Sequence, residues 1–160
     1  MSGLASRAAV ELGRSLAKFN GLVDGFVKRA EGELVKLQKR IVLEAFRRIV
    51  KRTPVDTGRT RGNWQITIGV VPTAEAAGTK LATAIGALTG LGPYQVVYIT
   101  NNVPHIEVLE YGLFEPRDPG PSKDPRKGRK GRELVRAGFS VQAPQGMVRV
   151  TVVELEVMFA

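Results

Sequence analysis

The tripeptide Asp56-Thr57-Gly58 matches the catalytic sequence of aspartic proteases. That chemistry needs two carboxylates that share one proton in a β-rich cleft. Here the tripeptide follows a basic helical pattern, and Arg59 comes directly after it. A turn explains the same residues, because Asp56 or Thr57 can accept backbone N–H bonds and Gly58 supplies an unusual dihedral. We therefore expect a structural turn and not a protease site.

The single histidine and two nearby glutamates are the other candidates for chemistry. His105 has no second histidine and no cysteine with which to hold a metal ion, so a turn or surface position fits it better, with a pairing to Glu107 or Glu110 left open. The two glutamates are three residues apart, without the third acidic residue of a cation-binding loop. We expect them to form salt bridges. Residues 128–131 lack the spacing of a phosphate-binding loop. The sequence therefore predicts no catalytic residue, no cofactor and no metal.

A basic stretch is the strongest physical signal in the chain. It holds eight basic and three acidic residues, interleaved with Gly and Pro and not with aromatics. Such a segment can neutralise phosphates, but it lacks the stacking platforms of a single-strand binder. We expect either a solvated loop or proximity to nucleic acid, without sequence-specific recognition. The candidate interface or DNA-facing residues are Arg117, Lys123, Arg126, Lys127, Arg129, Lys130, Arg132 and Arg136.

Composition limits the class of protein. With 160 residues and 43% hydrophobic content, the chain suffices for one core, which 6% aromatics make mainly aliphatic. The absence of cysteine excludes disulfides and thiolate chemistry and fits a reducing cytoplasm. The net charge of +9 indicates an anionic partner. We see no signal peptide and no apolar run of membrane-spanning length, so we expect a soluble protein made in the cytoplasm.

The N-terminal third of the chain has the residue pattern of helices. Residues 2–19 indicate a short helix or an arm, and Asn20-Gly21 interrupts the pattern. A long amphipathic helix follows from about Asp24 to Lys51, with Gly32 as a reason to begin it nearer residue 33. It ends at Thr53-Pro54. The domain prediction is an N-terminal arm or short helix over 1–20 and a single α+β domain over 21–160, with a basic loop insertion at 113–138.

Shorter elements follow the long helix. We expect strands over 64–71 and 94–100, a helix within 74–90, a short helix after Pro104 and a brief strand at Phe139 and Val141. Periodicity leaves Met147–Phe159 open between helix and strand. Trp64 can be an interface anchor or a core residue. Tyr111 is expected to be a packed aromatic before a turn at Gly112.

Four segments, in order, carry a resemblance to a known family. They are Thr53–Arg59 followed by Asn63-Trp64, then Ile99–Asn102, Leu109–Gly112 and Gln142–Arg149. After a long amphipathic helix, they resemble the minor tail component family of lambda-like tailed bacteriophages, whose members act in head–tail joining or tail completion. The similarity spans about Leu34 to Glu154. The structural motif positions are Pro54, Asp56, Thr57, Gly58, Arg59, Trp64, Asn101, Glu110, Tyr111, Gly112, Pro144 and Gly146.

The resemblance implies an α+β fold, with the long N-terminal amphipathic helix packed on a small, mostly antiparallel β-sheet, short additional helices and a long basic loop. It implies a helix after Gly146, a homo-oligomeric ring that is sixfold, and no catalysis and no cofactor. The ring would lie at the neck or tail top of the virion, next to a stopper or adaptor, the tail terminator and the tail tube, with no membrane. One departure is the long basic stretch, where the family has a shorter bridge.

Two other functions stay open. A tail-terminator ring that caps the tail tube shares the neck position, and the sequence separates it poorly from a joining protein. A basic, non-specific DNA-binding protein outside virions predicts salt-dependent DNA binding by the monomer. Within the ring hypothesis, residues 117–136 contact a neighbouring ring or face the path of the genomic DNA.

Overall fold

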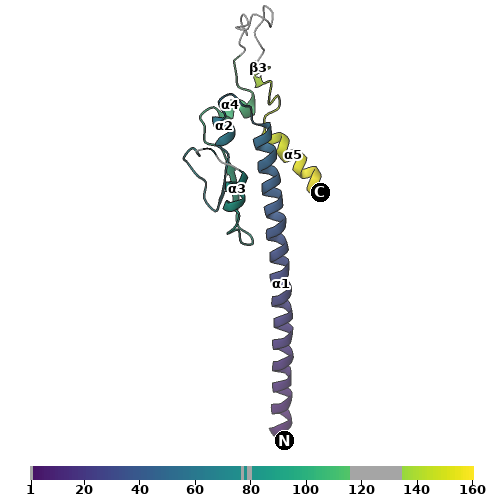
Figure 1. Ribbon diagram of the computed structural model, residues 1–160. Coiled ribbons are helices and arrows are strands. Elements are labelled where there is room, and N and C mark those ends of the chain that lie inside the picture. The colour runs from purple at the N-terminus through teal and green to yellow at the C-terminus, as the bar shows by residue number, and fades with distance from the viewer. Residues whose placement is uncertain (1, 77, 79–80, 116–134) are drawn as a thin grey trace, which may run out of the picture. The chain divides into compact units, whose positions relative to one another are not determined.

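A computed structural model describes residues 2–76, 78, 81–115 and 135–160, and for residues 2–6 and 8 it describes the backbone alone. The chain divides into two compact units, Met1–Gln38 with Gly92–Tyr94 and Lys39–Leu91 with Gln95–Ala160. The elements in chain order are α1 (Ser2–Arg52), α2 (Arg59–Gly62), β1 (Gln65–Ile68), α3 (Leu81–Ala87), β2 (Val97–Thr100), α4 (Ile106–Tyr111), β3 (Val135–Arg136), β4 (Phe139–Ser140) and α5 (Val148–Phe159) (Figure 1).

The first helix is one continuous element. The expected break at Asn20-Gly21 and the expected start at Asp24 or residue 33 are both wrong, because α1 is helical from Ser2 to Arg52. A single glycine costs a helix only about 1 kcal/mol, which neighbouring helical residues can offset. The end was predicted correctly. The Thr53 amide and hydroxyl both donate to the Ile49 carbonyl, at 3.0 and 2.8 Å, and Pro54 has no N–H to continue the ladder.

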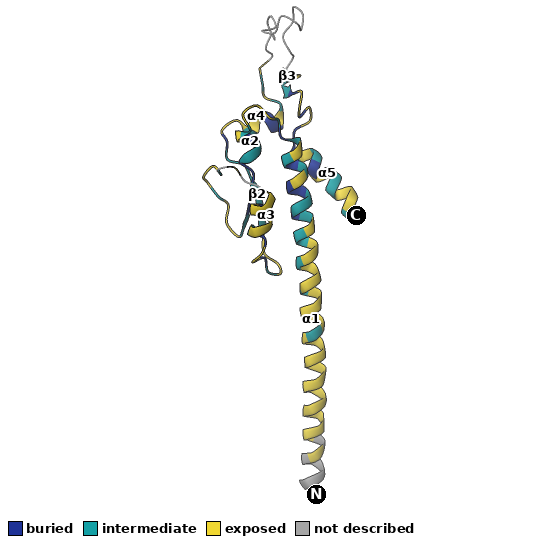
Figure 2. Ribbon diagram, in the orientation of Figure 1, coloured by how far each residue is buried: buried dark blue, intermediate teal, exposed yellow. Residues whose placement is uncertain are grey.

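Burial along α1 differs between its two parts (Figure 2). In the first unit the apolar side chains stay exposed, as Phe26 shows with 65% of its surface accessible. In the second unit Val42, Phe46 and Ile49 are buried, with 9% or less of their surfaces accessible. The wide apolar face expected over the whole helix is therefore covered by this chain only near its end.

The strands form two small antiparallel sheets. β1 pairs with β2 in the register Gln65↔Thr100 and Ile66↔Ile99, and β3 pairs with β4. Trp64 and Ile66 are buried whereas Gln65 is partly exposed, which confirms the start of the predicted alternation. The strand is shorter than the expected 64–71, and Val70, beyond its end, is 71% exposed. A turn separates β3 from β4, where Ala137 and Gly138 both have positive φ.

The core of the second unit draws on α1, β1, α3, α4 and the segments between the elements. Its buried apolar side chains are Val42, Ala45, Phe46, Ile49, Trp64, Ile66, Ala84, Leu88, Leu91, Val103, Leu109, Ala143 and Met147. The segment left open between helix and strand is helix α5, as the resemblance implied. The α+β class, with a long N-terminal helix, small antiparallel sheets and short additional helices, is confirmed. None of the helices described here is long and apolar enough to cross a membrane.

Candidate functional site

The residues that match the protease tripeptide form a turn. Gly58 has φ 86°, in the left-handed region that favours glycine, and the Arg59 amide donates to the Thr57 hydroxyl at 3.4 Å. Arg59 makes a bidentate ion pair with Glu75, whose oxygens lie 2.7 and 3.0 Å from its Nη2 and Nε. Asp56 is exposed on the same turn. The turn prediction is confirmed for Thr57 and Gly58.

Trp64 belongs to the core. Its indole is 3% exposed, and its Nε1 donates to the Thr53 hydroxyl oxygen at 2.8 Å. Thr53 is itself fully buried, and its hydroxyl donates a hydrogen bond to the carbonyl of Ile49, in the last turns of α1. The indole is thus joined to the helix end by a chain of two hydrogen bonds. This resolves the alternatives for Trp64 in favour of a core residue.

A cluster of asparagines joins the end of α2 to the end of β2. The Asn63 side-chain oxygen Oδ1 accepts a hydrogen bond from the Asn102 backbone amide at 3.2 Å, and Asn101 Nδ2 donates to the Thr60 backbone carbonyl at 2.8 Å. Asn102 Nδ2 donates in turn to the carbonyls of Pro72 and Ala74, at 2.9 and 2.8 Å. These amides therefore hold the loop after β1 against the end of β2.

Glu110 caps the start of α5 from another helix. Its carboxylate is buried, and it accepts the backbone N–H groups of Met147, Val148 and Arg149 at 2.7, 3.0 and 3.0 Å. Those amides have no partner inside α5, so the carboxylate satisfies them and suits the positive end of the helix dipole. The Arg149 guanidinium adds an ion pair at 3.5 Å. The salt bridge expected for Glu110 is confirmed.

Two glycines allow close backbone contact around this cap. Gly146 has φ 80°, and a Cβ there would lie 2.5 Å from the Glu110 carbonyl oxygen. Gly112 has φ 69° at the end of α4, and a Cβ there would overlap the ring of Phe139. Tyr111 is 56% exposed, so the expected packed aromatic is wrong, although the Arg149 guanidinium lies over its ring at 5.3 Å. At Gly112 and Gly146, therefore, the backbone geometry requires glycine, and no reactive side chain is involved.

The first and last motif segments are also joined. Gln142 Oε1 accepts the Val55 amide at 2.9 Å, and Gln142 Nε2 donates to the Val55 carbonyl at 3.5 Å. Pro54 precedes this contact and is half-buried. Pro144 is exposed and forms an isolated β-bridge with Gly146. The turn after α1 is therefore fixed to the turn before α5.

His105 and Glu107 do not form a reactive pair. His105 Nε2 lies 2.7 Å from the Thr60 hydroxyl oxygen, and the histidine is exposed where α4 begins. Glu107 is exposed on the same helix. Within the part of the chain that the structure covers, no group of His, Asp and Glu side chains could hold a metal ion.

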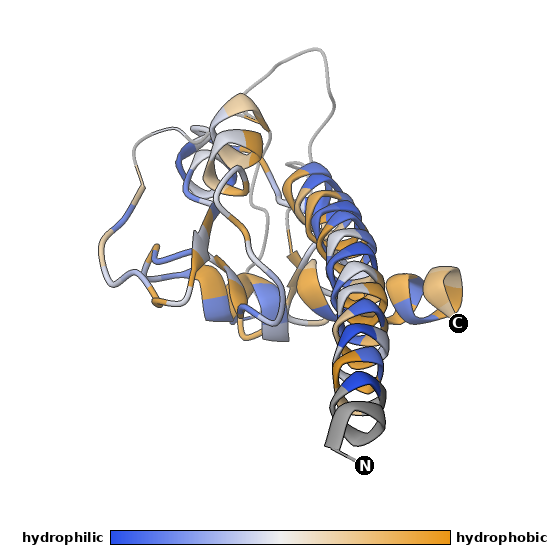
Figure 3. Cartoon of the chain, turned by 90° about the horizontal axis from the view of Figure 1, so that it is seen from below, coloured by the Kyte–Doolittle hydropathy of each residue, from blue (hydrophilic) through white to orange (hydrophobic). Residues whose placement is uncertain are grey.

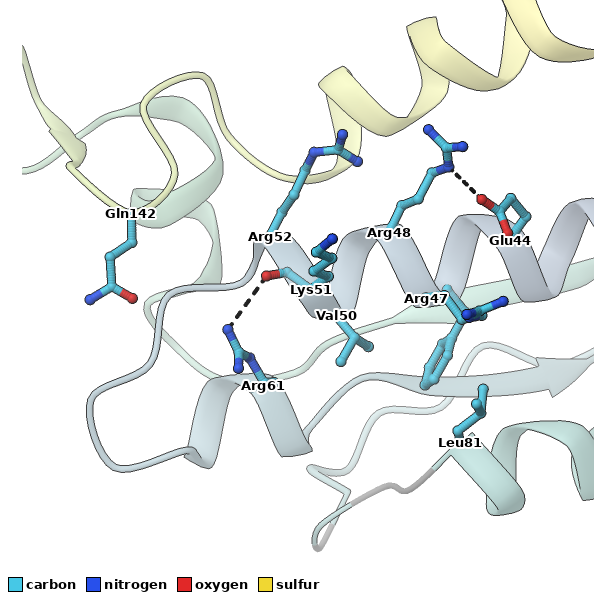
Figure 4. Close-up of a pocket in the computed structure, with 10 residues that line it drawn as sticks. Glu44, Arg47, Arg48, Val50, Lys51, Arg52, Arg61, Leu81 and Gln142 are labelled. Atoms are coloured by element: carbon cyan, nitrogen blue, oxygen red, sulfur yellow. Dashed lines mark hydrogen bonds and ion pairs between the residues drawn. The ribbon is translucent and has the colours of Figure 1, made fainter.

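A basic hollow lies beside the end of α1 (Figure 4). Its lining residues are Glu44, Phe46, Arg47, Arg48, Val50, Lys51, Arg52, Arg61, Leu81 and Gln142. Three of the five cations there are held by this chain. Arg48 and Arg52 both pair with Glu154, and Arg61 donates to the Thr53 carbonyl at 2.7 Å. Hydrogen bonds from Arg48 and Arg52 lower the pKa of Glu154, which keeps that carboxylate ionised.

The two other cations of the hollow are Arg47 and Lys51. Both are exposed, and neither forms an ion pair with any residue that the structure describes. They offer positive charge with which an anionic group can pair. Sequence reasoning did not single out this site, although the basic last turn of α1 was its signal.

Most of the basic stretch is outside the described residues, namely Arg117, Lys123, Arg126, Lys127, Arg129, Lys130 and Arg132. Arg136 is exposed in β3. The prediction that this stretch is an interface or faces DNA stays a prediction. Comparison of the chain with family models, with curated proteins and with solved structures finds no match.

Proposed function

We propose that this chain is a non-enzymatic structural subunit of a tailed bacteriophage. It assembles as a sixfold ring at the neck or tail top, where it completes the tail and joins it to the head. Its partners are copies of itself and the neighbouring neck and tail proteins, and genomic DNA passes close to it.

One observation carries this proposal. The four segments that resemble the phage family lie apart in the sequence, yet hydrogen bonds join them into one framework. Val55 bonds to Gln142, Asn102 to Asn63, and Glu110 to the start of α5. Chance matches of short motifs would have no reason to meet in the fold. Their contact supports a shared fold as the origin of the resemblance.

The character of the framework supports a structural role. Its polar side chains bond to backbone groups and to one another, as Glu110 and Asn101 do. Groups used in this way hold a fold and are not available to a substrate. In the basic hollow, Arg47 and Lys51 form no ion pair with a described residue, which suits contact with DNA phosphates or acidic neighbours without any reading of bases.

The test is electron microscopy of lysates from a phage that carries this gene, with the gene deleted and with a plasmid copy as the control. Filled heads beside separate tails of normal length are the expected result. Overlong tails would contradict a joining role and assign the tail-terminator role instead. Intact, infectious particles would remove the protein from the neck and leave the non-specific DNA-binding protein as the function to pursue.

A further inference from the structure

The first unit exposes an unusual amount of apolar surface along α1. Ten large apolar side chains there are 38–65% exposed. Their exposed surface is comparable to the roughly 800 Å² that each partner buries in a stable protein interface. They are Val10, Leu12, Leu16, Phe19, Leu22, Val23, Phe26, Val27, Leu34 and Leu37. Figure 3 shows the hydrophobic residues recurring along this helix among hydrophilic ones. A surface of this size on one helix needs a partner.

The spacing of these residues identifies the partner. Beginning at Ala9, apolar residues recur at alternating steps of three and four over seven positions. We call these positions the heptad seam; they are Ala9, Leu12, Leu16, Phe19, Val23, Phe26 and Ala30. A repeat of 3.5 residues keeps a seam in register with an identical seam on a supercoiled neighbour, whereas a helix lying on a sheet follows the 3.6 period.

The charged residues agree with this arrangement. Six charged residues lie between Ala9 and Ala30, and five face away from the seam: Glu11, Arg14, Lys18, Asp24 and Lys28. The sixth, Arg29, flanks the seam, as charged residues of coiled coils commonly do. Leu22 and Val27 flank the seam and widen the apolar face, as in bundles of more than two helices.

The helix also lacks support from its own residues. Gly13, Gly21 and Gly25 each reduce helix propensity by about 1 kcal/mol relative to alanine. A helix with exposed apolar side chains and several glycines gains most of its stability from packing. Two properties of this segment therefore indicate a partner: its exposed apolar surface and its low helix propensity.

We propose that the heptad seam is a self-association element, through which the N-terminal helices of several copies of this chain pack as a bundle. Leu16, Phe19 and Val23 form its centre. The inference rests on α1 alone and not on the phage role, so either can fail without the other.

The test uses sedimentation velocity of the full chain across micromolar concentrations. The wild type is expected to form an oligomer, and Phe19→Gln or Val23→Gln should raise its dissociation constant by more than about tenfold, because each buries an amide in the seam. Lys18→Gln and Lys28→Gln are the matched controls on the outer face, and they should leave the oligomer unchanged. Fluorescence of Trp64 in the second unit checks that each variant is folded.

Hydrogen exchange locates the contact. Amides of residues 9–30 should become more protected as the oligomer forms. A monomeric wild type would overturn the proposal, and so would an oligomer that the seam and control variants weaken equally. A monomer that binds anionic vesicles through these residues would also overturn it and assign the seam to a lipid surface.

Discussion

Phe26 and Phe46 are aromatic residues of the same helix, yet Phe26 is 65% exposed and Phe46 is 2% exposed. In the second unit, core side chains such as Phe46 are covered by the chain itself, although others such as Val157 stay exposed. Its buried polar groups Glu110 and Asn63 are satisfied by backbone partners. In the first unit apolar side chains remain accessible. A single helix can therefore contribute apolar side chains to an internal core at one end and leave others exposed for an external interface at the other.

The largest expected effect compares these two phenylalanines directly. Phe46→Ala should lower the free energy of unfolding by about 4 kcal/mol, because it leaves a cavity in the core. Phe26→Ala should change it by less than about 0.5 kcal/mol at concentrations where the chain is monomeric. Urea unfolding followed by Trp64 fluorescence measures both. Equal losses at the two positions would contradict the contrast in burial.

A smaller effect is expected at the cap of α5. Glu110→Ala should cost about 3 kcal/mol, because it leaves three backbone N–H groups without their acceptor and removes the ion pair with Arg149. Glu110→Gln keeps one acceptor oxygen and should cost less. Glu107→Ala, at an exposed position of the same helix, is the control and should be nearly neutral. Thermal unfolding followed by circular dichroism ranks the three variants. A Glu110→Ala variant as stable as the wild type would show that the cap does not stabilise the fold.

Backbone geometry gives the next prediction. Gly146→Ala should cost about 2 kcal/mol, because φ is 80° there and the added Cβ would lie 2.5 Å from the Glu110 carbonyl oxygen. Gly86→Ala, within α3 and with open space around its Cβ, should be neutral or slightly stabilising. The same unfolding measurement compares them. A stable Gly146→Ala variant would show that the α4–α5 contact can relax.

The smallest expected effect is on the stability of the fold at low pH. Pairing with Arg48 and Arg52 lowers the pKa of Glu154 below its ordinary value of 4.5, so this pairing stabilises the fold above about pH 4.5 and is lost as the pH falls further. Glu154→Gln should therefore reduce the loss of stability between pH 5 and acid pH. Urea midpoints for the wild type and the variant at each pH measure this. Parallel pH profiles would assign the acid sensitivity to other carboxylates.

Local signals predicted much of the fold. Pro54 stopped the long helix where expected, and the alternation from Trp64 located the first strand, because both depend on adjacent residues. The helix break predicted at Asn20-Gly21 is wrong, because the weak helix propensity of one or two residues is offset by the helical hydrogen bonds on either side. The sequence did not predict that Phe26 is exposed and Phe46 is buried, since both belong to apolar stripes of the expected helix and tertiary contacts decide which stripe is covered.

The candidate site was harder to predict than the fold. The resemblance grouped Trp64, Glu110 and Gly146 as structural residues without giving their partners. Glu110 caps a helix that begins 38 residues later, and no local pattern encodes a contact over that distance. The basic hollow depends on Glu154 and Gln142, which come from segments far from α1 in the sequence. Roles that depend on distant partners are decided by the tertiary fold.

The bond from the Phe114 amide to the Gly138 carbonyl, at 3.0 Å, closes the chain just outside the basic stretch. Together with the Glu110 cap, it fixes both ends of that stretch independently of what lies between them. The entropy of closing a loop rises only slowly with its length, by about 0.6 kcal/mol for each doubling. Evolution can therefore lengthen, shorten or recharge the intervening segment at little cost to the fold.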